Sequence, residues 1–113
     1  RQAYDAGLAP VRWLGGVAEW LPLLPGDNIG TVWDISQDGT IVGESGYLDG
    51  YIRRRVPVVW IGGVVHELAA VTAAPAGFAF AFSGPYGLND HGQIVGSGEL
   101  NGRSVAFVAT PRQ

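Results

Sequence analysis

Short apolar runs, separated by glycine, proline and small polar residues, follow one another along the whole chain. Such punctuation is typical of short strands joined by many turns. No stretch keeps apolar residues at helical spacing over three turns. The best helical candidate, residues 67–74, contains valine and threonine and ends at Pro75. The pattern therefore predicts an all-β protein.

Two parts of this pattern occur twice. Residues 10–21 (PVRWLGGVAEWL) match residues 57–68 (PVVWIGGVVHEL) at a spacing of 47, with seven of the twelve positions identical. Residues 35–43 (ISQDGTIVG) match residues 88–96 (LNDHGQIVG) at a spacing of 53. The difference of six positions (53 − 47) indicates an insertion in the second repeat, which we place in residues 69–85.

Each repeat predicts four short antiparallel strands. They cover residues 10–14, 17–21, 31–36 and 40–44 in the first repeat, and residues 56–61, 64–68, 86–89 and 93–97 in the second. Gly-Gly, Asp-Gly and His-Gly turns join them, since glycine takes the positive φ angles of tight hairpins. Four antiparallel strands in a repeat of about 40–50 residues are typical of a propeller blade.

The repeats also predict a domain plan. It comprises an N-terminal arm (1–9), a first blade (10–55), a second blade (56–103) with the insertion 69–85, and a closing strand and tail (104–113). The last part contains residues 105–111 (VAFVATP), which resemble residues 56–62 (VPVVWIG) and begin a third unit. The expected fold is β-propeller-like, with two four-stranded antiparallel blades and a partial third unit. The alternative is a small closed β-barrel or sandwich.

Two blades are too few to close a propeller, which usually takes roughly four to eight. Repeat units bury their faces only against neighbours, so a piece of this size needs more partners than it contains. Three arrangements meet this need: copies that assemble into a ring, a piece of a longer array, or strands that close on themselves. The partial third unit favours self-assembly, because its strand can then complete a sheet elsewhere in the ring. The chain begins with arginine, so we expect it to come from a longer precursor.

Composition and charge narrow the possible functions. The 113 residues (11.9 kDa) are 47% hydrophobic and 15% charged, which fits one folded domain. A formal net charge of −3 gives no basic field for a nucleic-acid partner. The absence of cysteine excludes disulfides, thiolate metal sites and thiol nucleophiles. No apolar run is long enough for a membrane-spanning helix.

The repeated turns resemble a known family. Residues 87–96 (GLNDHGQIVG) are similar to the Gly-Ile-Asn-x-x-Gly-Gln-Val-Val-Gly stretch of the HAF repeat family, and residues 34–43 (DISQDGTIVG) are a looser copy. The family's His-Ala-Phe-Leu-Trp strand is matched by residues 57–60 and 10–13, and most closely by residues 105–107, all without the histidine. The resemblance implies a propeller-like array in secreted or cell-surface bacterial proteins. It implies no catalytic residue and no cofactor.

One hairpin imitates the start of a calcium loop. Asp34, Ser36 and Asp38 alternate before a glycine, as the oxygen ligands of such a loop do. The glutamate required at the twelfth position is missing, and the second copy has no carboxylate at the three equivalent positions. We therefore expect a polar hairpin turn and no metal site. His66 on a strand and His91 in a turn are likewise expected to be structural.

The charge run Arg53, Arg54 and Arg55 is the first candidate for binding, together with Tyr51. It lies on the expected link between the blades. Three guanidinium groups can clamp a carboxylate or phosphate, or pair with acidic residues of a neighbouring subunit. The simpler interpretation is a solvated linker.

The aromatic residues are the second candidate. Trp13 and Trp60 occupy equivalent positions and are expected in the core, whereas Trp20 and Trp33 have no aromatic counterpart in the other repeat. An unrepeated aromatic side chain is suited to stacking on a sugar ring or filling a partner's pocket. Trp20 and Trp33 therefore join Tyr51 and the arginines as candidate binding residues.

The insertion carries Phe78, Phe80 and Phe82 at alternate positions, which places them on one face of a strand. We expect this face to be buried against another chain or blade. Taken together, the residues predict a non-enzymatic binding scaffold that assembles with its own copies or a longer array. Its ligand would be a saccharide or a protein. The alternative is part of a carbohydrate-active propeller enzyme, a hydrolase or lyase using acidic residues from loops.

Overall fold

A computed structural model describes residues 10–14, 16–80, 86–89 and 91–110. In this part of the chain, the only helical element is the 3-10 turn η1 (Leu68–Val71). It covers the middle of residues 67–74, which were the best helical candidate. The strands are β1 (Val11–Leu14), β2 (Val17–Trp20), β3 (Ile29–Ile35), β4 (Ile41–Asp49), β5 (Tyr51–Ile61), β6 (Val64–Glu67), β7 (Phe78–Phe80), β8 (Gly87–Leu88), β9 (Ile94–Leu100) and β10 (Arg103–Ala109). The prediction of an all-β protein is confirmed.

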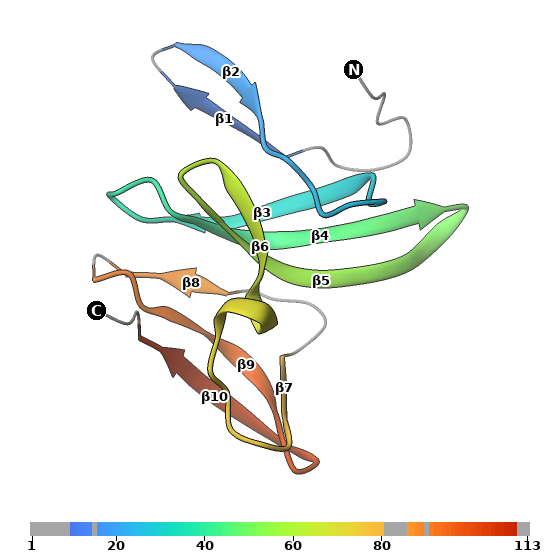
Figure 1. Ribbon diagram of the computed structural model, residues 1–113, viewed down its shortest axis with the longest axis vertical. Coiled ribbons are helices and arrows are strands. Elements are labelled where there is room, and N and C mark those ends of the chain that lie inside the picture. The colour runs from blue at the N-terminus through green and yellow to red at the C-terminus, as the bar shows by residue number, and fades with distance from the viewer. Residues whose placement is uncertain (1–9, 15, 81–85, 90, 111–113) are drawn as a thin grey trace.

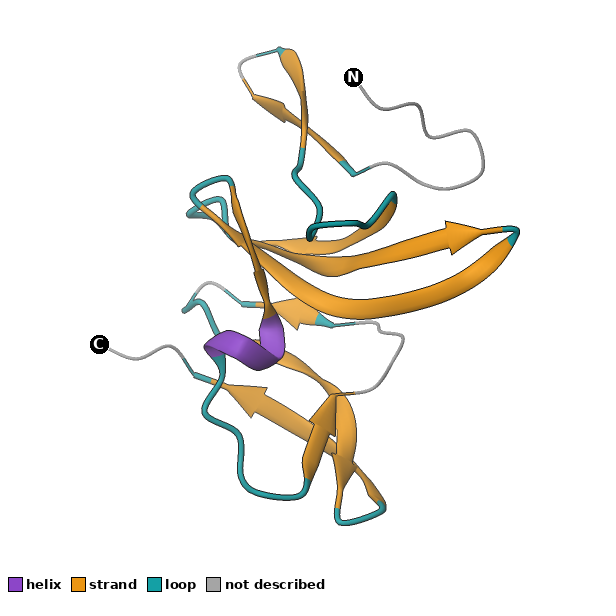
Figure 2. Cartoon of the chain, turned by 45° about the vertical axis from the view of Figure 1, so that its right-hand side comes forward, coloured by secondary structure: helices purple, strands orange, loops and turns teal. Residues whose placement is uncertain are grey.

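The strands form three layers stacked along the long axis of the molecule (Figures 1 and 2). The hairpin β1–β2 is the first layer, and the four-stranded sheet β3-β4-β5-β6 is the second. We call the latter the central sheet. The third layer, called here the second sheet, has the order β10-β9-β7, with β8 also paired to β9. All pairings are antiparallel, and the described strands close neither a barrel nor a propeller ring.

Both faces of the central sheet are covered, because successive side chains of a strand point to opposite faces. One face buries Ile41, Val58 and Trp60 together with Leu21, which lies after β2. The chain after β2 is held there by a hydrogen bond of 2.6 Å from Trp60 Nε1 to the Pro22 carbonyl. The opposite face packs on the second sheet and buries Val42, Val59, Leu68, Tyr86 and Ile94.

The predicted repeat of residues 35–43 in 88–96 is present in the backbone. Ile35 pairs with Ile41 across β3–β4, and the residues 53 positions later pair across β8–β9. The turns are alike too: Asn89 N–H bonds to the Gln93 carbonyl at 3.1 Å, and the equivalent bond in the first turn is 2.9 Å. Gly92 has a φ of 77° in its turn, a backbone conformation that glycine tolerates best.

The other two sequence matches are also structural equivalences. Trp13 pairs with Ala18 across β1–β2, and the residues 47 positions later pair across β5–β6. Val108 pairs with Val95 across β10–β9, which is the place that Val59 has in the central sheet. In the central sheet, β5 is the third strand and β6 is the fourth. The strands β1 and β10 are therefore both equivalents of β5, and β2 is the equivalent of β6.

The assignment of strands to sheets differs from the expectation. The expected first blade (10–55) is not one sheet, because β1 and β2 pair only with each other among the described strands, while β3 and β4 join β5 and β6. The expected boundary between residues 55 and 56 falls inside β5. The cause is a turn at Gly50 (φ 76°), which leads directly from β4 into β5. The arginines 53–55 thus lie in a strand, not on a link between blades.

The insertion contributes η1 and β7. Phe78 and Phe80 are half-buried on one face of β7, while Ala79 between them is exposed, as the alternation predicts. Phe80 packs against the core shared by the two sheets. Phe82 lies outside the described residues.

Candidate functional site

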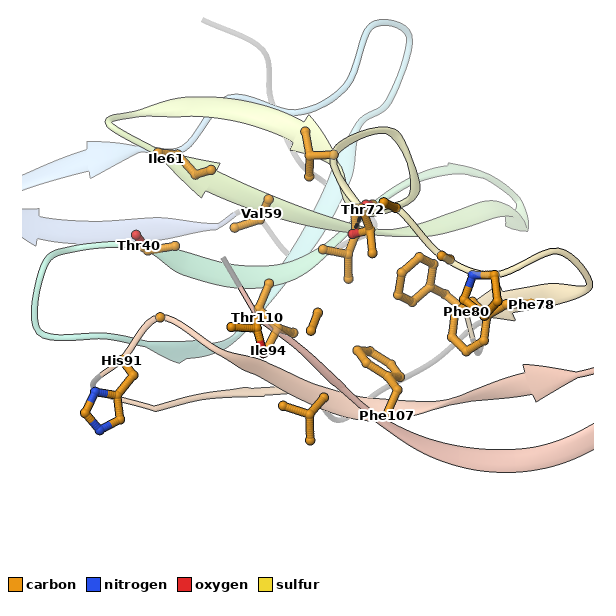
Figure 3. A pocket seen from close by; sticks show the side chains of 18 of the residues that line it. Thr40, Val59, Ile61, Thr72, Phe78, Phe80, His91, Ile94, Phe107 and Thr110 are labelled. Atoms are coloured by element: carbon orange, nitrogen blue, oxygen red, sulfur yellow. Dashed lines mark hydrogen bonds between the residues drawn. The ribbon is translucent and has the colours of Figure 1, made fainter. Parts of the chain in front are cut away.

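A groove of about 860 Å³ opens between the central sheet and the second sheet (Figure 3). Its walls are mainly apolar. They are formed by Val59, Ile61, Leu68, Val71, Phe78, Phe80, Ile94, Phe107 and Ala109, with Thr72–Pro75 along one side. Asp38, Thr40, His91, Gly92 and Thr110 line the rest. We call this space the intersheet groove. An apolar lining with a few polar groups at one end is typical of a site that accepts an apolar or aromatic group.

Phenyl rings form one end of the groove. The ring centroid of Phe107 lies 5.7 Å from that of Phe78 and 5.3 Å from that of Phe80, both in edge-on geometry. A third edge-on contact, at 5.7 Å, joins Phe107 to the buried Tyr86. Such pairs are favourable arrangements of aromatic rings. Because the rings support one another, this wall of the groove is built before any ligand arrives.

The polar end is made by the two equivalent hairpin turns. In the first turn, Asp38 accepts hydrogen bonds from the Ser36 hydroxyl and from the Thr40 backbone N–H. These bonds lower the pKa of Asp38 below its ordinary value, and the bond from Ser36 has the largest effect. In the second turn, Asn89 Oδ1 accepts from the backbone N–H of His91 at 2.9 Å. The polar groups therefore serve first to hold the turns.

The carboxylates of the calcium-like motif are occupied by protein donors. Asp34 Oδ2 accepts from the Leu88 backbone N–H at 2.7 Å, and its Oδ1 accepts from the Ile35 backbone N–H at 2.8 Å. Within the described ranges, no group of three or more potential ligands is placed to hold a metal ion. The arrangement is that of a polar hairpin turn that also contacts the second sheet.

The arginine run divides between the two faces of the central sheet. Arg54 lies 3.4 Å from Asp27 on the face that packs on residues 21–28, and Arg55 donates from Nε to Glu44 Oε1 at 3.0 Å on the other face. Both acidic side chains are almost fully buried. Arg53 is exposed, with its guanidinium carbon 4.0 Å from the centre of the Tyr51 ring. Two of the three arginines therefore neutralise buried carboxylates of their own chain.

The two unrepeated tryptophans have different environments. Trp33 is half-buried, and its ring centroid lies 4.8 Å from that of Tyr86, so it belongs to the core between the sheets. Trp20 is 52% exposed on β2. Of the six candidate residues, four are exposed: Trp20, Tyr51, Arg53 and Arg54. They do not share one sheet, since Trp20 lies on β2 and the other three lie on β5.

The far face of the second sheet is a further exposed apolar surface. Val108 is 62% exposed there, whereas its equivalent Val59 in the central sheet is 2% exposed. Val95, which pairs with Val108, is also exposed, whereas its equivalent Val42 is buried. In the central sheet the covering layer is the second sheet itself. The far face of the last described layer is therefore an exposed apolar surface at positions that are buried in the central sheet.

Sequence reasoning did not identify the intersheet groove. Its walls come from strands of different repeats, Val59 on β5 and Phe107 on β10, together with η1. The useful signals were present separately: the alternating phenylalanines of the insertion, and residues 105–111, which resemble residues 56–62. Their meeting depends on how the sheets stack.

Comparison with protein-family models, with curated proteins and with solved structures finds no match. Among the described residues, no helix has the length and apolar character needed to cross a membrane.

Proposed function

We propose that this chain is a non-enzymatic interaction scaffold built from propeller-like repeats, which binds further repeats through its incomplete layers. One observation carries the proposal. Among the described strands, the second sheet repeats the register of the first three strands of the central sheet, and its outer strand is β10, where the central sheet continues into β6. An open strand edge of this kind is a template for pairing with another strand.

The exposed valines support the same proposal. In the central sheet, the pair Val42–Val59 is buried between layers, whereas the equivalent pair in the second sheet, Val95–Val108, is exposed. The partner that fits such a surface is another β-sheet layer of the same kind, supplied by a second copy or by a longer array. The finer fold, an open piece of a β-propeller, belongs to this proposal. So does the secreted or cell-surface location, which rests on the HAF-like turns at residues 34–43 and 87–96.

The enzymatic alternative has less support from the geometry. Among the acidic residues that the structure describes, Asp27, Asp34, Asp38 and Glu44 have carboxylates that contact groups of their own chain. Tyr51, with Arg53 over its ring, is the exposed aromatic group best suited to a saccharide ligand.

The mass of the isolated chain in solution tests the proposal. Light scattering after size exclusion is expected to give a multiple of 11.9 kDa, about 36 kDa for three chains (3 × 11.9) that supply six sheets. A chain that unfolds cooperatively as a monomer would contradict self-assembly. It would leave the exposed valines without the partner proposed here.

A further inference from the structure

The two incomplete layers of this chain complement each other. In the described part of the chain, the second sheet contains equivalents of the first three strands of the central sheet but none of the fourth. The hairpin β1–β2 contains equivalents of the third and fourth. The fourth strand missing from the edge of β10 is therefore present in the chain, as β2. In Figure 1, β2 and β10 lie at opposite ends of the stack, so β2 of the same molecule does not reach that edge.

Resting on the proposed self-assembly, we propose that β2 of a second copy adds to the outer edge of β10 and inserts Trp20 into the intersheet groove. The register follows from the central sheet, where Val58 pairs with Glu67. The equivalent of Val58 in β10 is Phe107 (58 + 49), and the equivalent of Glu67 in β2 is Trp20 (67 − 47). The central-sheet register therefore places Phe107 opposite Trp20. The same shifts place Ala109 opposite Ala18.

The face of the sheet decides where the indole goes. Phe107 and Ala109 point toward the central sheet and line the groove. A residue directly opposite another on a neighbouring strand lies on the same face, so Trp20 opposite Phe107 points into the groove as well. There it meets the ring wall made with Phe78 and Phe80. A volume of about 860 Å³ leaves ample room for one indole.

The choice of residue fits this role. The repeat has Glu67 at the position of Trp20, so the tryptophan is not required by the shared fold. In the single chain, 52% of Trp20 remains exposed. Tryptophan is enriched among the residues that contribute most to protein interfaces, where such residues fill well-packed pockets from which water is excluded. The groove and the anchor are thus two ends of one interface.

The addition requires β2 to leave β1, because β1 pairs with the edge that β10 would use. Isolated two-stranded hairpins are marginally stable in water. In the exchange, β2 leaves β1 and pairs with β10. Both β1 and β10 are equivalents of β5, but β10 already belongs to a larger sheet. The backbone pairing of β2 is kept, and burial of Trp20 is gained.

The absence of cysteine allows a direct test of the register. The double variant Ala18→Cys/Ala109→Cys places two thiols at the proposed pair. That pair corresponds to Trp60–Val65 in the central sheet, the second pair counted from the Gly62-Gly63 turn. In a two-residue hairpin this is a non-hydrogen-bonded pair, whose Cα atoms lie about 4.5 Å apart. This separation suits a disulfide. The control Ala18→Cys/Ala106→Cys moves one thiol by three residues, roughly 10 Å along the strand.

Mild oxidation followed by a non-reducing gel is expected to link chains covalently in the first variant and not in the control. If the chain assembles but the two variants link equally, or neither links, strand addition is overturned while the proposed scaffold stands. A disulfide confined within one chain would also overturn it. A cooperatively folded monomer overturns both proposals.

Trp20→Ala tests the anchor without a new thiol. We expect the concentration at half-assembly to rise at least about tenfold, the range of an interface hot spot. The control is Ile52→Ala, which removes an exposed apolar side chain from β5, a strand that does not pair with β2, and is expected to leave assembly unchanged. Assembly that is insensitive to Trp20→Ala would overturn the insertion of this residue into the groove.

Discussion

Asp34 on β3 accepts a hydrogen bond of 2.7 Å from the backbone N–H of Leu88 on β8. The contact joins the central sheet to the second sheet through two hairpins that are copies of each other. It is also a charge-assisted bond, since a carboxylate accepts from a peptide group. The carboxylate that looked like the first ligand of a calcium loop is instead part of the contact between layers.

We expect Asp34→Ala to lower the free energy of unfolding by about 2 kcal/mol, because it leaves the Leu88 and Ile35 N–H groups without this acceptor. Urea unfolding at one protein concentration measures the change. Glu99→Ala, which removes an exposed carboxylate from β9, serves as control and should change stability by less than about 0.5 kcal/mol. Equal losses in both variants would show that the Asp34 contact contributes nothing particular.

The three consecutive arginines should differ strongly in their effect on stability. Arg55→Ala leaves the buried Glu44 carboxylate without its cation and is expected to cost about 3 kcal/mol. Arg54→Ala should cost less, since its distance of 3.4 Å to Asp27 is longer. Arg53→Ala loses only the stacking on Tyr51 and should cost less than about 1 kcal/mol. Denaturant midpoints of the three variants give the order, and a largest loss at Arg53 would contradict it.

Ser36→Ala should raise the pKa of Asp38 toward its ordinary value of 3.8, because the largest cause of the lowered pKa is the hydrogen bond from the Ser36 hydroxyl. Carboxyl-carbon NMR during an acid titration measures this directly. The sign for stability follows from linkage. A carboxyl whose folded pKa is lowered stabilises the fold above its unfolded pKa, and this contribution is lost as the pH falls through the folded value.

The contribution of Asp38 should therefore be intact at neutral pH and disappear only in acid below about pH 4. Asp38→Asn provides the matched comparison, because it keeps the size of the side chain and removes the titration. If the Asp38 resonance titrates at the same pH in Ser36→Ala as in the unaltered chain, the hydroxyl is not the cause of the shift.

Val108→Asp should reduce the solution mass toward that of the single chain, since it places a charge on the exposed face of the second sheet. Val64→Asp is the control, with a side chain of similar exposure (56% against 62%) at the turn between β5 and β6. Light scattering at matched concentrations compares them. Equal loss of mass in both variants would assign the effect to charge in general rather than to this face.

Short-range features of the fold could be predicted from the sequence. The hairpins at residues 35–43 and 88–96 depend on a turn glycine and on Asp or Asn side chains that bond to the backbone two residues on, as Asp38 and Asn89 do. Such chemistry is encoded within a few residues. The same reasoning matched residues 105–111 to residues 56–62, and the register of β10 against β9 confirms that equivalence.

The grouping of strands into sheets could not be predicted in this way. It depends on the segment after β2, where Leu21 enters the core and Ser45 Oγ accepts a hydrogen bond from the Leu24 N–H at 3.1 Å. These contacts join residues about 20 positions apart or more and carry no periodic pattern. The environments of two candidate binding residues could not be predicted for the same reason. Trp33 packs on the core between the sheets and Arg55 pairs with Glu44, and both contacts come from other strands.

The division of the arginine run between two sheet faces has a consequence for the electric field around the molecule. Arg54 and Arg55 each lie next to a carboxylate of opposite charge, so each pair is close to neutral when seen from a distance. Salt screens single exposed charges beyond about 8–10 Å, and a neutral pair contributes less still. The densest positive stretch of the sequence therefore contributes, at long range, little more than the single charge of Arg53.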